Sequence, residues 1–424
     1  MRRLLFVVCA CVSFSAASAL AQTTAIRAGH VVDPETGVIR DNQIIVIEAG
    51  RIRSVGAGPP PAGTPVIDLS AAYVLPGLFD VHTHLATTTV AARDADRFLI
   101  TAWLEPTAFR AIQGVTNLRS MLESGFTTVR DLGNAGNYAD TAMRRAIDDG
   151  WIPGPTLVNA GRIIAPYGGQ YRLQPEKKDL AEPEYFIADT VDEIRKAVRE
   201  NIHYGALVIK LVVDERWYGY SEDDIRAAVD EAGRARTKVA VHVNTDAGAL
   251  NAARAGVATI EHHGAARDET FTLMKDRNVF LVPTAYPVGS YAGVTAAAYA
   301  RSVDRLKRAH EIGVPLAFGT DVTYYREGRT RGDLSLDFVQ SFVDAGIPAA
   351  EILRIMTVNG ARAMGVEARR GALKDGLAAD IIAVPANPLT DIKTLRNVSF
   401  VMKDGIVYKR DGHFAWETPR KIGR

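Results

Sequence analysis

Two histidines are spaced in a way that suits metal binding. The stretch GLFDVHTHL (77–85) places His82 and His84 two residues apart at the end of an apolar run. If this run is a β-strand, both imidazoles face the same side, because side chains alternate along a strand. Imidazole nitrogens are common ligands of Zn²⁺ and similar divalent ions. An ordinary polar strand end has the same appearance, so the pair alone leaves both interpretations open.

Further side chains of this kind occur at or near the ends of later apolar runs. Each has an ordinary explanation: a hydrogen-bonded histidine, a lysine that reaches the rim or an aspartate that caps a helix. A single site would collect all of them if the runs are strands that share one mouth. The residues are Lys210, His242, Glu261, His262, His263 and Asp321.

The elements that must position these residues alternate along the middle of the chain. Apolar, strand-like runs are separated by helix-compatible stretches, which is typical of a parallel sheet covered by helices. Residues 76–367 are therefore predicted to form an α/β fold, a (β/α)8 TIM-type barrel. An open doubly wound sheet is the alternative, but no glycine-rich nucleotide fingerprint supports it. The runs are 77–84, 126–131, 156–161, 207–213, 238–243, 258–263, 279–284 and 315–321.

Both ends of the chain have a different pattern, with short strands and turns. Glu48-Ala-Gly50 and Lys403-Asp-Gly405 are hairpin turn signals between apolar runs. We expect residues 22–75 and 368–424 to form one small β-sandwich domain built from both termini.

The first 21 residues have the pattern of a secretory signal peptide. A positive Met1-Arg-Arg3 precedes a mostly apolar stretch and small residues at 19–21. The apolar stretch is shorter than the roughly 20 residues that a membrane span needs. We expect an exported protein, periplasmic or secreted, with no membrane association after cleavage. Cys9 and Cys11, the two cysteines of the sequence, lie in this segment, so the mature chain has neither a disulfide nor a thiol nucleophile. The balance of 50 basic and 49 acidic residues gives no reason to expect nucleic-acid binding.

Taken together, these motifs resemble the amidohydrolase superfamily. The resemblance rests on PGLFDVHTHL, Lys210 in LVIKLVV, His242 in VAVHV, GVATIEHHG, FGTD, and the C-terminal stretch that begins TVNGARAMG. It covers nearly all of the mature chain. Within the superfamily the chain is similar to the imidazolonepropionase-like and Xaa-Pro dipeptidase-like group, which includes bacterial ochratoxin-degrading amidohydrolases.

The resemblance implies two divalent metal ions, for which N and O ligands favour zinc. His82, His84 and Asp321 would bind one ion, and His242 and His262 the other. Lys210 would be carboxylated to N6-carboxylysine and bridge both ions. Asp321 would also be the catalytic acid and base. Outside the ligand set, we expect Asp80 to support the histidines, and His263 either to pack against its surroundings or to support the ligands.

The implied reaction is hydrolysis of an amide bond in a small molecule. The expected substrates are Xaa-Pro-type dipeptides and N-acyl amino acids, including ochratoxin-like N-acyl-phenylalanine amides. A cyclic amide, a lactone or a phosphotriester is the alternative substrate class. A further alternative is that the chain is a non-catalytic binding protein of the same fold. Tyr218 and Tyr220, after the run 207–213, are candidate substrate contacts, and packing of the barrel rim is the other explanation for them. The resemblance also implies a homo-oligomer, and octamers occur in the family.

Overall fold

The computed structural model describes residues 23–215, 217–291 and 294–416. The predicted signal peptide lies outside these residues. None of the helices in the described ranges is both long and apolar enough to cross a bilayer.

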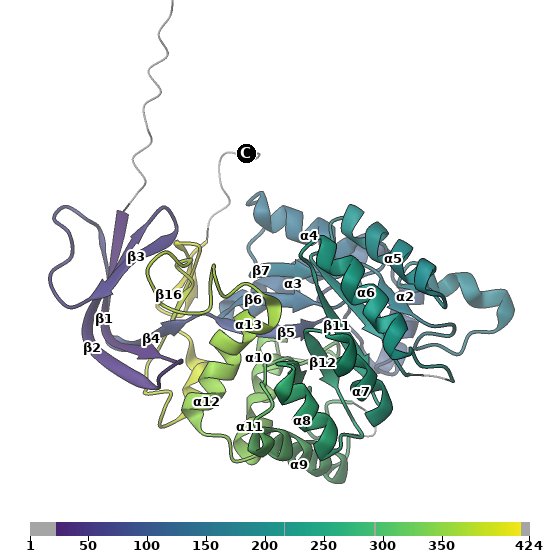
Figure 1. Cartoon of the computed structure of the whole chain (residues 1–424). Helices are drawn as coiled ribbons and strands as arrows, with labels where there is room; N and C mark the ends of the chain where they lie inside the picture. The colour runs from purple at the N-terminus through teal and green to yellow at the C-terminus, as the bar shows by residue number, and fades with distance from the viewer. Residues whose placement is uncertain (1–22, 216, 292–293, 417–424) are drawn as a thin grey trace, which may run out of the picture.

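Strands from the two ends of the chain form one mixed sheet (Figure 1). In the described part of the chain its order is β17-β16-β15-β14-β4-β1-β2-β3, and β14 joins the two ends by running antiparallel to β4. Both predicted hairpin turns are confirmed, because Ala49-Gly50 and Asp404-Gly405 link adjacent strands with positive φ angles. The strands are β1 (Thr23–Asp33), β2 (Val38–Glu48), β3 (Arg51–Gly56), β4 (Val66–Pro76), β14 (Ile381–Val384), β15 (Phe400–Lys403), β16 (Ile406–Arg410) and β17 (His413–Phe414).

A single apolar cluster lies under this sheet and takes residues from both termini. Ile26 and Ile45 from the N-terminal strands pack with Ile381 and Phe400 from the C-terminal strands, and all four are buried. The two termini therefore share one core. The strand pairing defines one sheet and does not by itself define the second layer of the predicted β-sandwich.

The middle of the chain contains two parallel sheets, which confirms the α/β class. Seven of the eight predicted runs contain a strand, whereas the run 315–321 contributes only an isolated bridge from Leu316 to Leu281. Strands β8 and β9 were not predicted. As paired in the described residues, the two sheets are open. One sheet has β5 (Leu78–Thr83), β6 (Phe126–Asp131) and β7 (Thr156–Asn159), and the other has β8 (Ile163–Ala165), β9 (Tyr185–Ile187), β10 (Val208–Val212), β11 (Lys238–Val243), β12 (Thr259–His262) and β13 (Phe280–Val282).

Helices lie around the parallel strands (Figure 1). Helix α6 begins with a capping box formed by Ser221 and Asp224. The helices are α1 (Ala91–Asp94), α2 (Phe98–Leu104), α3 (Thr107–Glu123), α4 (Ala139–Asp148), α5 (Val191–His203), α6 (Glu222–Arg234), α7 (Asp246–Ala255), α8 (Asp268–Asp276), α9 (Ala296–Ile312), α10 (Arg331–Asp337), α11 (Val339–Asp344), α12 (Ala349–Arg354) and α13 (Gly360–Met364), with 3₁₀ turns η1 (Pro175–Ala181) and η3 (Ile392–Asn397) and a π-helical turn η2 (Ile355–Asn359).

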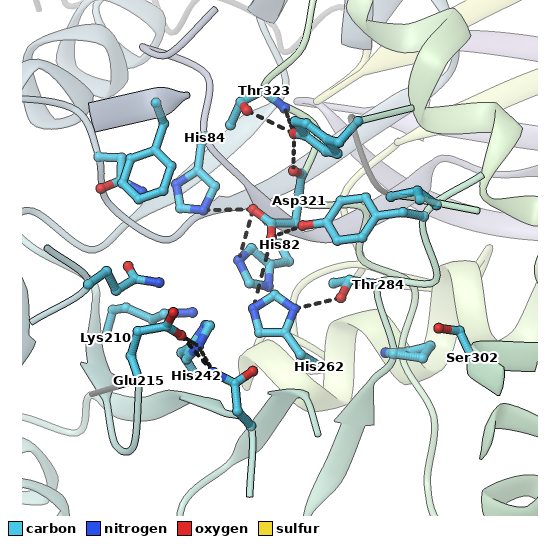
Figure 2. A pocket seen from close by; sticks show the side chains of 18 of the residues that line it. His82, His84, Lys210, Glu215, His242, His262, Thr284, Ser302, Asp321 and Thr323 are labelled. Carbon is cyan, nitrogen blue, oxygen red and sulfur yellow. Dashed lines mark hydrogen bonds and ion pairs between the residues drawn. The ribbon is translucent and has the colours of Figure 1, made fainter. Parts of the chain in front are cut away.

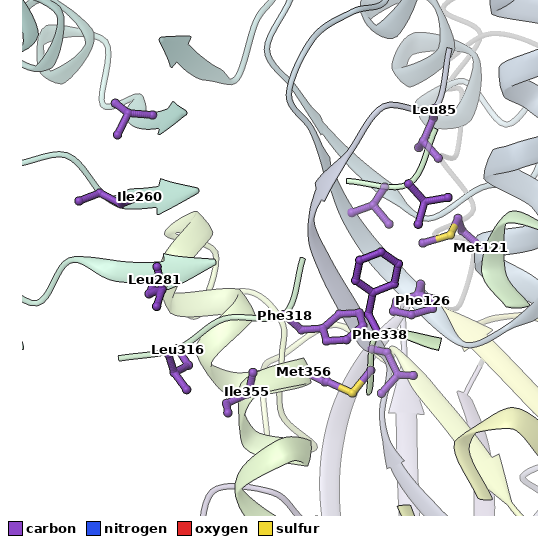
Figure 3. Packing of buried hydrophobic residues seen from close by; sticks show 14 of the residues in the cluster. Leu85, Met121, Phe126, Ile260, Leu281, Leu316, Phe318, Phe338, Ile355 and Met356 are labelled. Atoms are coloured by element: carbon purple, nitrogen blue, oxygen red, sulfur yellow. The ribbon is translucent and has the colours of Figure 1, made fainter. Parts of the chain in front are cut away.

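Packing and backbone hydrogen bonds hold the run 315–321 beside β5. The Phe318 ring stacks on Phe126 with a centroid distance of 6.0 Å (Figure 3). The Val81 amide donates to the Phe318 carbonyl at 2.8 Å, and the Asp321 amide donates to the His82 carbonyl at 2.7 Å. These contacts place Asp321 next to the two histidines of β5.

A pair of glycine substitutions tests the packing at the start of β5. A Cβ at Gly77 would lie 2.1 Å from Thr127 Oγ1, whereas a Cβ at Gly233 in α6 would meet nothing within 4 Å. We expect Gly77→Ala to reduce the free energy of unfolding by about 1–3 kcal/mol through overpacking. Gly233→Ala should raise it by about 0.4–1 kcal/mol, because alanine has less freedom to lose in a helix. Denaturant titration of both variants measures this; equal effects would contradict it.

Candidate metal centre

A cavity of about 460 Å³ opens beside the C-terminal ends of the parallel strands (Figure 2). Its wall includes all six residues predicted from the sequence as metal ligands. They are His82, His84, Lys210, His242, His262 and Asp321.

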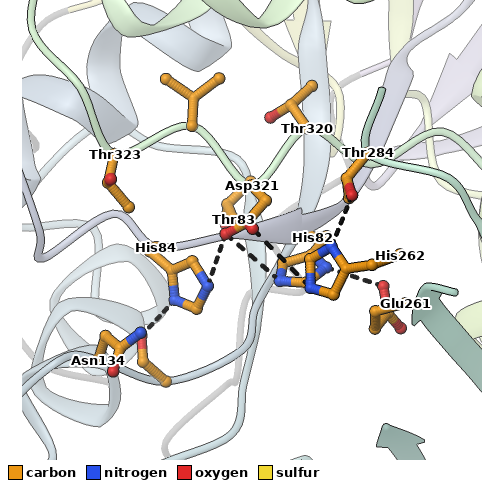
Figure 4. Close-up of polar contacts among 12 residues, drawn as sticks. His82, Thr83, His84, Asn134, Glu261, His262, Thr284, Thr320, Asp321 and Thr323 are labelled. Atoms are coloured by element: carbon orange, nitrogen blue, oxygen red, sulfur yellow. Dashed lines mark hydrogen bonds and ion pairs between the residues drawn. The ribbon is translucent and has the colours of Figure 1, made fainter. Parts of the chain in front are cut away.

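Three histidine rings surround the carboxylate of Asp321 (Figure 4). Its Oδ1 atom is 3.0 Å from His84 Nε2 and 3.6 Å from His82 Nε2, and its Oδ2 atom is 3.9 Å from His262 Nε2. One ligand atom each from His82, His262 and Asp321 lies within 4.8 Å of the others. Nitrogen and carboxylate donors this close together suit a divalent transition metal or zinc.

The same three histidines each use Nδ1 for a hydrogen bond to the protein. His82 Nδ1 is 2.9 Å from Glu261 Oε2, and His262 Nδ1 is 2.6 Å from Thr284 Oγ1. His84 Nδ1 is 2.7 Å from the carbonyl oxygen of Gly133, in the loop after β6. Because Nδ1 is occupied, Nε2 of each ring is directed toward the carboxylate. Hydrogen bonds of this kind fix the orientation of metal-binding imidazoles.

Glu261, which holds His82, is itself held by a buried arginine. Arg130 Nη2 lies 2.8 Å from Glu261 Oε1, and Arg130 Nε donates to the Val81 carbonyl at 2.6 Å. Thr259 also donates its hydroxyl to Glu261. Neither charged group reaches solvent, so each depends on the other for compensation.

The local electrostatics favour the ligand forms of most of these groups. Burial opposes ionisation of Asp321, but His82 and His84 hold the pKa of this carboxyl well below its usual value. Burial, with the charge of Lys210, puts the pKa of His82 well below that of free histidine, and burial does the same for the pKa of His262. The pKa of His84 is raised by Asp321 against the effect of burial. A proton and a metal ion would therefore compete for His84.

Left-handed backbone is concentrated at this site. His262, His263, Thr284 and Asp321 have φ angles of 67°, 49°, 41° and 57°. Such angles are unfavourable for residues other than glycine, above all for a β-branched threonine. Backbone of this kind persists only where the surroundings fix it, and it is common at functional sites.

Lys210 and His242 line the same cavity but have different surroundings. Lys210 is only 2% exposed, and no hydrogen bond or ion pair to its Nζ occurs among the described residues. Burial lowers the pKa of Lys210 to about 8. His242 uses Nε2 rather than Nδ1, at 2.8 Å from Glu215 Oε2 and 3.0 Å from Asn244 Nδ2. Its ring lies 4.6 Å from that of His262.

Two residues outside the predicted ligand set, Asp80 and His263, are buried. The carboxylate of Asp80 accepts hydrogen bonds from the Thr320 hydroxyl at 2.7 Å and from the His82 amide at 3.1 Å, so it ties β5 to the run that carries Asp321. His263 is buried against Phe271 with a ring distance of 5.6 Å. Neither ring nitrogen of His263 has a hydrogen-bond partner in the described part of the chain.

Other residues of the cavity were not anticipated from the sequence. Tyr286 donates its hydroxyl to Asp321 Oδ2, and Thr284 and Glu215 hold two of the histidines. Thr284 ends the predicted run 279–284, and Glu215 lies two residues beyond the run 207–213. The position of Thr284 and Glu215 at or just beyond the end of a predicted strand run was the signal that could have identified them. Neither is a histidine or lysine, the residue types that drew attention to the other strand ends.

The two predicted substrate contacts are not in the cavity wall. Tyr218 is 73% exposed and borders a separate hollow of about 300 Å³, together with Trp217. Tyr220 is buried and donates its hydroxyl to the Ala188 carbonyl at 2.6 Å. The segment after β10 turns away from the cavity before it reaches these residues, so Tyr220 serves packing and Tyr218 lies on the surface.

Comparison with known proteins places the chain in a family. The model of the amidohydrolase family matches residues 73–407, so the chain belongs to this family. It is a hydrolytic enzyme that acts on carbon–nitrogen bonds.

Several relatives are similar over most of their length. Ochratoxinase from Aspergillus niger is 28% identical over 385 residues, which are 81% of this chain and 77% of that protein. Its crystal structure has a TM-score of 0.79 at 26% identity and covers 92% of this chain and 96% of that one. The structure of an Xaa-Pro dipeptidase with methionine in its active site has a TM-score of 0.78 at 27% identity. The match covers 91% of this chain and 100% of that one. The structure of a prolidase complexed with N-methylphosphonate-L-proline has a TM-score of 0.80 at 27% identity. The match covers 92% of this chain and 100% of that one.

The role of Glu261 can be tested by a neutral substitution. We expect Glu261→Gln to weaken metal binding by about 10- to 100-fold, because His82 loses the acceptor that orients it. Metal titration in the presence of a competing chelator measures the change. Glu269→Gln, on the exposed start of α8, is the matched control and should bind metal as the unmodified protein does. Unchanged affinity in Glu261→Gln would contradict the assigned role.

Proposed function

We propose that this chain is a binuclear metal-dependent amidohydrolase that cleaves the amide bond of dipeptides or N-acyl amino acids. The observation that carries the proposal is the convergence of three histidine Nε2 atoms on the Asp321 carboxylate inside a cavity. The likeness to ochratoxinase and to prolidase structures supports the substrate class.

We further infer that the two parallel sheets are parts of one (β/α)8 barrel over residues 76–367. Two hydrogen bonds support this closure. The Leu207 amide, just before β10, donates to the Asn159 carbonyl of β7 in the other sheet at 2.8 Å, and the Leu281 amide of β13 donates to the Pro315 carbonyl of the run 315–321 at 2.9 Å. The run 315–321 would be the eighth strand, held on one side by β13 and on the other by β5. Residues 22–75 and 368–424 would then be the small β domain, whose shared core supports a sandwich.

The cavity residues divide into two ligand sets. His82, His84 and Asp321 would hold one ion, and His242 and His262 the other. We propose zinc for both, since histidine and carboxylate donors suit it. When bound, such ions acidify water and polarise a carbonyl group. The hydrogen bonds from Nδ1 of His82, His84 and His262 to the protein support the first set and half of the second.

Lys210 would bridge the two sets as a carbamate. Its amine nitrogen would form a bond to the carbon of CO2 and release a proton, giving an anion with two oxygen donors. Only a neutral amine reacts in this way, and the pKa of about 8 produced by burial makes that form accessible near neutral pH. The lack of a carboxylate partner for Nζ among the described residues also leaves the amine free to react.

Asp321 would move the proton of the reaction. Its carboxylate is ionised and would accept a proton from the attacking water and pass it to the leaving amine nitrogen. Tyr286 donates a hydrogen bond to Oδ2 of this carboxylate and would hold it in position. The left-handed backbone at Asp321 fixes the direction of the side chain.

A substrate screen tests the proposal directly. The purified protein, with its metal content measured in the same sample, is assayed against Xaa-Pro dipeptides, N-acyl-phenylalanines including ochratoxin A, a lactone and a phosphotriester. The proposal requires hydrolysis of at least one amide and about two metal ions per chain. Activity on the lactone or the phosphotriester but on no amide would contradict the substrate class.

Substitution of Asp321 separates proton transfer from metal binding. We expect Asp321→Asn to lower kcat by about 10²- to 10⁴-fold, because the amide cannot accept the proton. Metal content should be largely retained, since the amide oxygen remains a donor. Steady-state kinetics with metal analysis measures both, and Asp304→Asn on the exposed face of α9 is the control. Near-normal turnover in Asp321→Asn would exclude the proton-transfer role.

The carbamate can be observed spectroscopically. Zinc-loaded protein incubated with ¹³C-bicarbonate should show a carbamate carbon resonance that is absent from Lys210→Arg. With ¹³CO2 supplied to the metal-free protein at a constant partial pressure, the rate of label incorporation should rise as the pH rises through about 8, the pKa of Lys210, because the neutral amine is the reactive form. Lys238→Arg, at the exposed start of β11, should retain the signal. A signal that persists in Lys210→Arg would refute the assignment.

A further inference from the structure

The cavity contains a guanidinium group whose hydrogen-bonding capacity is barely used. Arg305 extends from helix α9 to line the cavity wall. Its Nε atom is buried and has no hydrogen-bond partner among the described residues. The hydrogen bond that its Nη2 donates to the Pro283 carbonyl is long, at 3.5 Å. Most of the donors of this guanidinium are therefore free within the described structure.

Among the described residues, no acidic side chain forms an ion pair with Arg305. Burial lowers the pKa of Arg305 to about 10, and no nearby carboxylate acts in the opposite direction. The group is still a cation at neutral pH. Burial and the neighbouring cations lower the pKa of His262 most, and the charge of Arg305 lowers it further. Arg305 therefore lies within electrostatic reach of the metal-binding residues.

Three fully buried arginines have strong partners that the part-buried Arg305 lacks among the described residues. Arg110 pairs with Glu184, and Arg130 pairs with Glu261. Arg331 donates to several backbone carbonyls, including that of Thr87 at 2.7 Å. An unpaired buried charge is costly in free energy. The fold avoids that cost at three sites and accepts it at the cavity wall, as expected where a ligand supplies the anion.

The next turn of α9 provides an internal contrast. Arg308, one turn after Arg305, does not line the cavity and pairs with Asp268 at the start of α8. Ser302, one turn before Arg305, lies on the cavity wall (Figure 2), as expected for residues spaced by three on a helix. One face of α9 therefore presents a hydroxyl and a guanidinium to the cavity.

We infer that Arg305 binds a carboxylate of the substrate. This inference rests on the proposed function, because a dipeptide or N-acyl amino acid carries a free carboxylate close to its scissile amide. A guanidinium matches a carboxylate with two parallel hydrogen bonds, which fixes orientation as well as charge. The amino-acid half of the substrate would then lie against α9, with its amide directed to Asp321. The site would discriminate against amides that lack the carboxylate.

Calorimetric titration of the metal-loaded protein with N-acetyl-D-phenylalanine and its neutral carboxamide tests this binding. We expect the unmodified protein to bind the acid about 10- to 100-fold more tightly than the carboxamide. Arg305→Gln should lose that preference while its affinity for the carboxamide stays within about twofold, and Arg305→Lys should keep part of it. Arg308→Gln should behave as the unmodified protein does.

The outcomes separate this inference from the proposed reaction. An equal loss of affinity for acid and carboxamide in Arg305→Gln would mean a packing role and would overturn the inference, as would an unchanged preference for the acid. If Arg305→Gln does not fold, Arg305→Met replaces it as the neutral variant and is measured beside Arg305→Lys. An unchanged preference for the acid in Arg305→Met would then overturn the inference. A preference for the acid that depends on Arg305, in a protein that hydrolyses no amide in the screen, would support the carboxylate site and reject the proposed reaction.

Discussion

The contact of Glu261 with Arg130 and His82 is the interaction on which the site depends most. It joins β12 of one parallel sheet to β5 and β6 of the other, with all three side chains buried. An ion pair without solvent is stabilising only if each charge keeps its partners, so the contact fixes the separation of the two sheets. It also sets the tautomer and the direction of the His82 ring, because the carboxylate occupies Nδ1. The same carboxylate therefore serves the assembly of the fold and the geometry of the cavity.

The functional groups themselves lie where the regular strands stop. His262, Thr284 and Asp321 adopt left-handed backbone at the strand ends, which the neighbouring hydrogen bonds hold in place. This arrangement turns side chains of β12, β13 and the run 315–321 toward a common point that straight strands would not reach. The strands provide a rigid base, and the strained residues provide the final orientation.

The sequence indicates the α/β class, seven of the eight strand runs and the hairpin turns, because each depends on local patterns of apolar and turn residues. It also identifies the histidines, Lys210 and Asp321 that line the cavity, because their types and positions at strand ends are unusual. It does not identify Tyr286 or Glu215, whose roles arise only when distant loops meet. The short strands β8 and β9 were missed because their segment has little apolar periodicity. Tyr218 and Tyr220 were candidate substrate contacts with packing as the other explanation, and neither lines the cavity, because local sequence does not determine the direction of a loop.

The sheet shared by both termini has a consequence for synthesis of the chain. Strand β4 carries an unpaired edge until β14 arrives, and nearly the whole of the intervening chain must be made first. Chains fold from the N-terminus as they leave the ribosome, and an open strand edge invites pairing with other chains. The nascent protein therefore exposes an unpaired, aggregation-prone strand edge through most of translation. Completion of this sheet is a late, long-range event, and it makes the yield of folded protein sensitive to the concentration of unfinished chains.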